Sequence, residues 1–169
     1  MNDTATRTSY TYVTHWNGAA TPEADSDVLA FWQREGALAA ETKSEDRLKQ
    51  IVLHARDGDE VAAVCTAPPL TLPRLGQPMY YYRCFIGKRW RSTRLVFKLL
   101  TRAFETLEAY AREREFPCIG VVLELENTRF AEALRTPVWP STGFVFVGKS
   151  GRNLDLRLRY FRGARLKKA

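Results

Sequence analysis

Residues 79–114, MYYYRCFIGKRWRSTRLVFKLLTRAFETLEAYARER, join three different patterns end to end. Residues 79–86 are rich in aromatic and apolar side chains, which is typical of a strand. Residues 87–91, GKRWR, form a short basic segment that opens with glycine. From about residue 92 to 114, apolar side chains recur every three or four positions, which predicts a long amphipathic helix. The stretch therefore predicts a strand, a basic loop and a long helix.

The chain before this stretch alternates between short strands and helices. Residues 8–16 alternate β-branched and aromatic side chains, which predicts a strand. Helix starts are expected at Thr21 and Ser44, the first helix running to about residue 38. Residues 51–55 and 60–67 predict two strands joined through a hairpin at residues 57–59, DGD. The prolines of residues 68–78 favour a loop.

The chain after the long helix returns to strands. Residues 118–125 are almost continuously apolar, as in a strand covered on both faces. A short helix is expected over 127–135 and two final strands over 144–147 and 154–161. The order β-α-α-β-β-β-α-β-α-β-β predicts an α/β (α+β) fold with a single mixed, mostly antiparallel twisted sheet and helices on both faces. We expect one domain over residues 1–169, with a loose basic tail from about 162.

Composition excludes several classes of protein. The chain has 169 residues, of which 45% are hydrophobic, enough for a packed core. It contains no apolar run long enough for a transmembrane helix and shows no signal peptide, so we expect a cytoplasmic protein without a membrane partner. Three cysteines and two histidines give no zinc-site spacing, so no metal is expected. His15 and His54 favour structural roles within strands.

Positive charge is concentrated in two stretches. The net charge is +7, but residues 1–60 carry 11 acids and 6 bases. Residues 83–102 hold seven basic residues and no acid, and residues 145–169 hold eight basic residues and one acid. Clustered positive charge indicates a polyanionic partner such as a phosphorylated cofactor or nucleic acid, and the plainer alternative is a solvated basic surface.

The basic loop before the long helix indicates a phosphate site. The first turn of a helix leaves backbone N–H groups without partners, and the helix dipole places partial positive charge there. Lys88, Arg89, Arg91 and Arg94 surround this end in the sequence. Because arginines oppose the dipole at a helix start, their presence favours an anionic ligand such as a pyrophosphate over a purely structural role.

The element order over roughly residues 8–161 resembles the GNAT-type acyl-CoA N-acyltransferase superfamily. The family's loop, Arg/Gln-x-x-Gly-x-Gly/Ala, corresponds to residues 91–96, RSTRLV, and its later Asn and Gly-Phe correspond to Asn127 and to residues 143–144. The resemblance implies acetyl-CoA or another acyl-CoA as cofactor and acetyl transfer to a small-molecule or macromolecular primary amine. It implies that the cofactor is bound by the following residues: Phe85, Ile86, Arg91, Ser92, Thr93, Arg94, Leu95, Val96 and Asn127.

The sequence departs from the family pattern in two places. Arg94 and Val96 fill the two small positions of the loop, where glycine would let backbone approach a phosphate closely. The tyrosine that often precedes the family's Gly-Phe is missing, and residues 137–140, PVWP, stand in that region. These departures keep open a non-catalytic GNAT-fold binding protein that has lost CoA.

Acyl transfer to an amine needs a base for the amine and an acid for the leaving thiolate. Glu124 and Glu126 are candidate bases because they lie two residues apart, on one side of a strand end; the alternative is an ion pair with a nearby arginine. Tyr82 and Tyr160 are candidate acids. Cys84 is a candidate for covalent acylation, although a core thiol is the simpler interpretation.

Two features leave partners open. Trp139, between two prolines, either covers the substrate site or plugs the core. Arg157 and Arg159 share one face of the last predicted strand, and with the aromatic residues 160 and 161 they could dock nucleic acid through phosphate contacts and stacking. A nucleic-acid-directed enzyme is therefore a further alternative. The family resemblance is also compatible with a homodimer.

Overall fold

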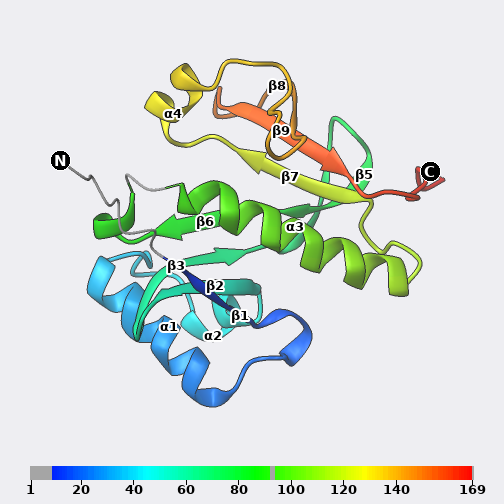
Figure 1. Ribbon diagram of the computed structural model, residues 1–169. Coiled ribbons are helices and arrows are strands. Elements are labelled where there is room, and N and C mark those ends of the chain that lie inside the picture. The colour runs from blue at the N-terminus through cyan, green and yellow to red at the C-terminus, as the bar shows by residue number, and fades with distance from the viewer. Residues whose placement is uncertain (1–8, 92–93, 169) are drawn as a thin grey trace.

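The computed structural model describes residues 9–91 and 94–168, which form two sheets (Figure 1). The first sheet is antiparallel and has the strand order β1 (Thr11–Thr14), β2 (Ile51–Asp57), β3 (Glu60–Thr66) and β6 (Arg83–Ile86). The second has the order β4 (Pro69–Leu72), β5 (Gln77–Tyr81), β7 (Gly120–Glu124), β9 (Asp155–Tyr160) and β8 (Val145–Lys149). Only β5 and β7 pair in parallel. The mixed, mostly antiparallel α/β fold predicted from the sequence is confirmed.

The single strand expected over residues 79–86 is divided at Tyr82, and this divides the expected single sheet into two. Before the break, Tyr80 and Tyr81 pair with Val121 and Val122 of β7. The Tyr82 N–H still donates to the Val122 carbonyl at 2.8 Å, but from residue 83 onward the chain pairs with β3 instead. The two sheets therefore part beyond Tyr82, and β6 and β7 diverge toward their carboxyl ends (Figure 1).

Helices cover both faces of the first sheet. Helix α1 (Pro22–Glu35) packs Val28, Phe31 and Trp32 against one face. It begins at Thr21, whose Oγ1 accepts from the Ala24 N–H, and ends at Gly36, which has the left-handed φ of 64° that favours glycine. Helix α3 (Leu95–Glu113) covers the other face. The five residues of its predicted stripe are fully buried: Leu95, Leu99, Ala103, Leu107 and Ala111.

The remaining elements are short. They are η1 (Trp16–Gly18), α2 (Ser44–Leu48), η2 (Lys88–Trp90) and α4 (Thr128–Ala133). Helix α2 has Lys43 rather than the expected Ser44 at its N-cap. None of the helices within the described residues is long and apolar enough to cross a bilayer.

Two further sequence predictions about local structure are wrong. The expected loop over 68–78 contains β4, which forms a hairpin with β5. Pro69 is tolerated there because β4 is an edge strand. The expected loose tail is fastened over residues 162–168. Lys167 exchanges two hydrogen bonds with the Gln77 side chain, at 2.7 and 3.1 Å, and the Arg162 N–H donates to Glu108.

Candidate active site

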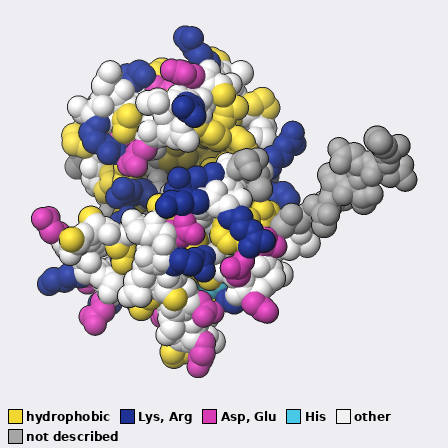
Figure 2. Space-filling model, turned by 90° about the vertical axis from the view of Figure 1, so that its left-hand side faces the viewer, with side chains coloured by type: hydrophobic (Ala, Val, Ile, Leu, Met, Phe, Trp, Pro, Cys, Tyr) yellow, Lys and Arg dark blue, Asp and Glu magenta, His cyan; other side chains and the backbone are white. Residues whose placement is uncertain are grey.

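A cavity of about 400 Å³ lies where β6 and β7 part. Figure 2 looks into this side of the molecule and shows a hollow between an upper and a lower lobe, with Lys and Arg side chains gathered around it. Residues of both sheets line the cavity, together with residues from the end of α1, from α2, from the start of α3 and from α4. Strand divergence creates the space, because no strand formed by residues 9–91 or 94–168 fills the gap between β6 and β7.

Side-chain alternation along the two strands divides the cavity into two halves. Tyr82, Leu123 and Leu125 belong to the core cluster packed under α3, so this half is largely apolar. The intervening residues point the other way, since successive side chains of a strand face opposite sides. That second half contains Arg83, Glu124 and Glu126, and it is polar. We call these the α3 half and the α1 half of the cavity.

The register of β6 directs backbone groups into the gap. The Gly87 N–H donates to the Ala62 carbonyl, and the pairing continues without a shift through residues 63–66 of β3. In an antiparallel ladder alternate residues bond the same neighbour, so Arg83 and Phe85 bond β3. The N–H groups of Cys84 and Ile86 therefore face the gap. The Ile86 carbonyl accepts from Arg91 Nε at 3.1 Å. By the register of β6, the Ile86 N–H faces the cavity wall as a donor.

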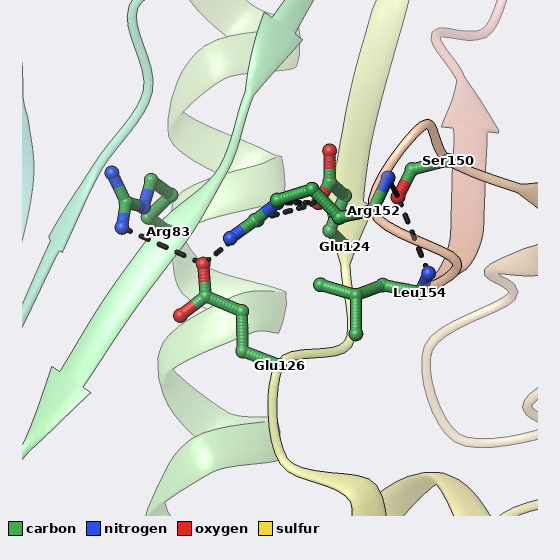
Figure 3. A network of polar contacts seen from close by, with 6 residues as sticks. All are labelled: Arg83, Glu124, Glu126, Ser150, Arg152 and Leu154. Carbon is green, nitrogen blue, oxygen red and sulfur yellow. Dashed lines mark hydrogen bonds and ion pairs between the residues drawn. The ribbon is translucent and has the colours of Figure 1, made fainter.

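Both candidate bases lie in the α1 half and both are held by Arg152, in the turn between β8 and β9 (Figure 3). Arg152 Nε lies 2.9 Å from Glu124 Oε2, and Arg152 Nη2 lies 3.0 Å from Glu126 Oε1. Arg83 Nη2 approaches the same Glu126 oxygen at 3.5 Å. The prediction that the two carboxylates share one side of the strand is met, and the ion pair weighed as the alternative is also present.

The two candidate acids lie in different places. Tyr82 is buried on the cavity wall, and its hydroxyl has no hydrogen-bond partner among the described residues. Burial raises the pKa of Tyr82 well above its usual value, and the neighbouring Cys84 and Cys65 add to this. Tyr160 pairs with Gly120 at the opposite end of β7 from Glu124, so it lies outside the cavity lining. Tyr160 lies there because β9 runs antiparallel to β7, which places the end of β9 beside the start of β7. The sequence did not reveal this pairing.

Cys84 lies on the cavity wall, where solvent reaches it through the opening. The surrounding protein raises the pKa of its thiol to about 11 by desolvation, so the thiol is protonated at neutral pH. The thiolate is the nucleophilic form of cysteine, and this arrangement therefore argues against a covalent acyl-cysteine.

The basic loop before α3 is tied to the body of the protein. Arg89 pairs with Glu60 at 2.7 Å, and Trp90 Nε1 donates to Asp57 at 2.8 Å. Arg91 lines the cavity and lies over the Phe85 ring. Arg94 is exposed at the N-cap of α3. Of the arginines predicted to surround a phosphate, Arg91 and Arg94 therefore lie near the helix start, whereas Arg89 points to β3.

The other predicted cofactor residues divide into three groups. Phe85, Ile86, Val96 and Asn127 line the cavity. The Leu95 side chain is fully buried in the core, so it cannot contact a ligand at the surface. Ser92 and Thr93 lie outside the described residues. Asn127 also has a structural role, because its Oδ1 accepts from the Phe130 N–H at 3.2 Å and caps α4.

Trp139 both lines the cavity and packs into the core. It is 3% exposed, and its Nε1 donates to the Leu134 carbonyl at 3.2 Å. Its ring meets Phe97 and Phe130 edge to face, at centroid distances of 6.2 and 6.0 Å. The interpretation that Trp139 plugs the core is confirmed, and the same ring also lines the α3 half of the cavity.

Of the two arginines expected on a basic face, Arg157 is buried and Arg159 is half-buried. Arg157 is 2% exposed and donates to the carbonyls of Leu134 and Pro137, with its guanidinium 4.4 Å from the Trp139 ring centroid. Arg159 donates to the Thr142 carbonyl and lies over Phe104. Both bind carbonyls of the loop that connects α4 to β8, and the buried Arg157 therefore cannot contribute to a basic surface face.

The buried histidines lie outside the cavity. His15 Nδ1 lies 2.9 Å from Asp25 Oδ1, and His15 Nε2 lies 2.7 Å from His54 Nδ1. Burial lowers the pKa of both rings, and that of His54 falls to about 4. Neither imidazole reaches the gap between β6 and β7, as the structural interpretation of the sequence predicted.

Comparisons with known proteins identify the fold. No family model and no curated protein matches the chain. Among solved structures, an acetyltransferase of the GNAT family from Streptococcus pneumoniae superposes with a TM-score of 0.60 at 16% identity, covering 90% of this chain and 99% of that one. The yncA protein of Salmonella typhimurium, solved with its cofactor acetyl-CoA, gives 0.58 at 15% identity, covering 95% and 99%. A mutant AtaT toxin bound to the C-terminus of the antitoxin AtaR gives 0.57 at 13% identity, covering 89% and 92%. The chain has the GNAT acyltransferase fold.

Four residues of the site were not found from the sequence. Arg152 and Arg47 bring charge to the α1 half, and Phe97 and Phe130 add aromatic walls to the α3 half. Phe97 lies on the long helix, whose apolar periodicity indicated a core face, and Phe130 lies on the short helix, where no pattern singled it out. Only the basic character of the β8–β9 turn hinted at Arg152, and nothing in the pattern around Arg47 set it apart from an exposed helix residue.

Proposed function

We propose that this protein is an acyl-CoA-dependent N-acyltransferase that transfers an acetyl group to a primary amine. The observation that carries the proposal is the cavity between β6 and β7, with the Ile86 N–H directed into it and the start of α3 beside it. A donor at a fixed place on a cavity wall stabilises the negative charge that develops on a thioester carbonyl during attack by an amine.

The residues present fit an acyl-CoA. The α3 half is apolar and leads from the helix start to the Ile86 N–H, as a pantetheine arm requires. The first turn of α3 carries no acid, and Arg91 and Arg94 flank it, so a pyrophosphate would meet N–H groups and positive charge there. When bound, the cofactor supplies an activated acyl group. The Val96 side chain, which stands where the family has a small residue, lines the cavity and leaves it open.

The protein's own groups can manage the protons. The amine nitrogen must lose a proton as the C–N bond forms and the C–S bond breaks. Glu126 and Glu124 are placed to receive it directly or through water, once the amine competes with Arg152 for their oxygens. Tyr82 Oη keeps its proton because its pKa is raised, and it has no acceptor among the described residues, so it can donate to the departing sulfur.

Acetyl-CoA binding measured by titration calorimetry tests the proposal. Val96→Asp places a carboxylate in the first turn of α3, where it favours the helix dipole but repels a phosphate. We expect the wild-type chain to bind, and Val96→Asp to bind about tenfold more weakly or worse without a lower unfolding midpoint. Val147→Asp, the same change on exposed β8, should bind like wild type. No binding by the wild-type chain at millimolar acetyl-CoA would overturn the proposal in favour of the non-catalytic binding protein.

Acetyl transfer identifies the base. Release of free CoA in the presence of amines should fall in Glu126→Gln or Glu124→Gln, while acetyl-CoA affinity stays unchanged because both carboxylates lie in the α1 half. Loss of affinity together with activity would show that these residues hold the cofactor instead.

A further inference from the structure

One guanidinium group in the α1 half of the cavity has no hydrogen-bond or ion-pair partner among the residues that the structure describes. Arg47 projects from α2 into the cavity lining and is half-buried. Its side chain makes no hydrogen bond or ion pair with any described residue. Burial lowers the pKa of Arg47, and the neighbouring Arg83 lowers it further. Two positive side chains thus face the same space beside each other.

The carboxylates of this half neutralise these two arginines only in part, with Glu126 raising the pKa of Arg47 by its charge. Arg152 engages both Glu124 and Glu126, at 2.9 and 3.0 Å (Figure 3). Arg83 reaches only the Glu126 oxygen already bonded by Arg152, at 3.5 Å. Arg152, Arg83 and Arg47 thus supply three guanidinium groups around two carboxylates, which leaves one positive charge in excess on the side of Arg47 and Arg83. Figure 2 shows the Lys and Arg side chains around the same hollow.

An anion would satisfy this arrangement. Guanidinium forks bind carboxylate and phosphate oxygens with charge-assisted hydrogen bonds, and such bonds gain strength where water is partly excluded. The apolar side chains of Trp32 and Leu38 line the same half and limit solvent around the two arginines. The α3 half is taken by the acyl-CoA in the proposed function, which leaves the α1 half to the acceptor.

We propose that Arg47 and Arg83 bind a carboxylate or phosphate group of the acyl acceptor, so that the substrate is an amine carrying a negative charge. The assignment to an acceptor rests on the proposed function, whereas anion binding at Arg47 and Arg83 does not. With its anionic end on these arginines, a short acceptor presents its amine toward Glu126, next to Arg83. A neutral amine or a polyamine would leave the two guanidinium groups facing each other.

Calorimetry with three small amines at matched ionic strength tests the proposal. The probes are β-alanine, O-phosphoethanolamine and ethanolamine, each titrated into the full chain with and without saturating acetyl-CoA. We expect the two anionic probes to bind at least tenfold more tightly than ethanolamine. Tighter binding of β-alanine would assign a carboxylate, and tighter binding of O-phosphoethanolamine a phosphate.

Charge-matched variants locate the site. Arg47→Gln and Arg83→Gln should each weaken the anionic probes by about tenfold to a hundredfold. Arg165→Gln, which removes the same charge from the exposed end of the chain, should leave them unchanged. Inorganic phosphate should displace both anionic probes from the wild-type chain, a test that needs no variant to fold.

The outcomes separate this proposal from the proposed function. The anion site is refuted, and the proposed function is not, if the chain binds acetyl-CoA but binds ethanolamine as tightly as the anionic probes. The same holds if neither variant weakens the binding of the anionic probes. If acetyl-CoA does not bind while the anionic probes bind through Arg47 and Arg83, the enzyme fails and the anion site stands.

Discussion

Replacing Arg157 by Met should destabilise the protein substantially, because this buried guanidinium holds the loop that carries Trp139. Arg157 donates to two backbone carbonyls, Leu134 and Pro137, at 3.1 and 3.3 Å. A hydrogen bond from a charged donor contributes about 1.5–3 kcal/mol, and the guanidinium stacked on Trp139 adds about 1 kcal/mol. Methionine keeps the volume and removes the desolvation of the charge, which offsets part of the loss. We expect a net loss of about 2–4 kcal/mol.

Thermal and urea unfolding of the Arg157→Met variant measure this loss. For a domain of this size, about 2–4 kcal/mol lowers the unfolding midpoint by roughly 5–15 °C. Arg152→Met is the control, since its side chain is 56% exposed and surface ion pairs contribute about 1 kcal/mol or less. An Arg157→Met protein that unfolds at the wild-type midpoint, or an Arg152→Met protein that loses as much, would refute the reasoning.

Three further changes have outcomes fixed by the packing. Leu99→Ala, in the buried stripe of α3, should cost about 2–5 kcal/mol in urea unfolding, and a loss below 1 kcal/mol would contradict full burial. Gly87→Ala should lower the midpoint, because its Cβ would lie 2.8 Å from the Trp90 ring, while Gly151→Ala has open space and should not. Burial lowers the pKa of His54 to about 4 from 6.5, so the unfolded chain binds more protons between these values. The contribution of His54 to the free energy of unfolding should be complete above pH 6.5 and should fall by on the order of 3 kcal/mol toward pH 4. If the His54→Gln variant loses stability with the same pH slope, groups other than His54 cause the loss.

Regular periodicity made most of the fold predictable. The stripe from Leu95 to Ala111 repeats over five turns, and every member is fully buried. The two-sided burial of β7 followed equally from its continuous apolar run. The break at Tyr82 did not, because aromatic and apolar strand-forming residues continue on both sides of it. The change of partner from β7 to β3 is set by long-range pairing, which leaves no local mark in the sequence.

The sequence predicted which strands and which carboxylates form the candidate site, but it did not predict the arginines that pair with them. Glu124 and Glu126 were found because a period of two places them together. Their partner Arg152 lies in a turn 26 residues or more away in the chain, and no spacing rule links them. Arg157 was misassigned to the surface for the opposite reason. A charged residue in an alternating strand normally faces solvent, but here a loop from residues 134–143 covers it and supplies carbonyl acceptors.

Backbone amide NMR of the chain titrated with acetyl-CoA tests the central claim most directly. If the acyl group is received in the gap between β6 and β7, the amide signals of Cys84 and Ile86 should shift and their hydrogen exchange should slow, while those of Phe146 on β8 stay unchanged. Binding that leaves Cys84 and Ile86 unshifted, or that perturbs β8 instead, would contradict the account.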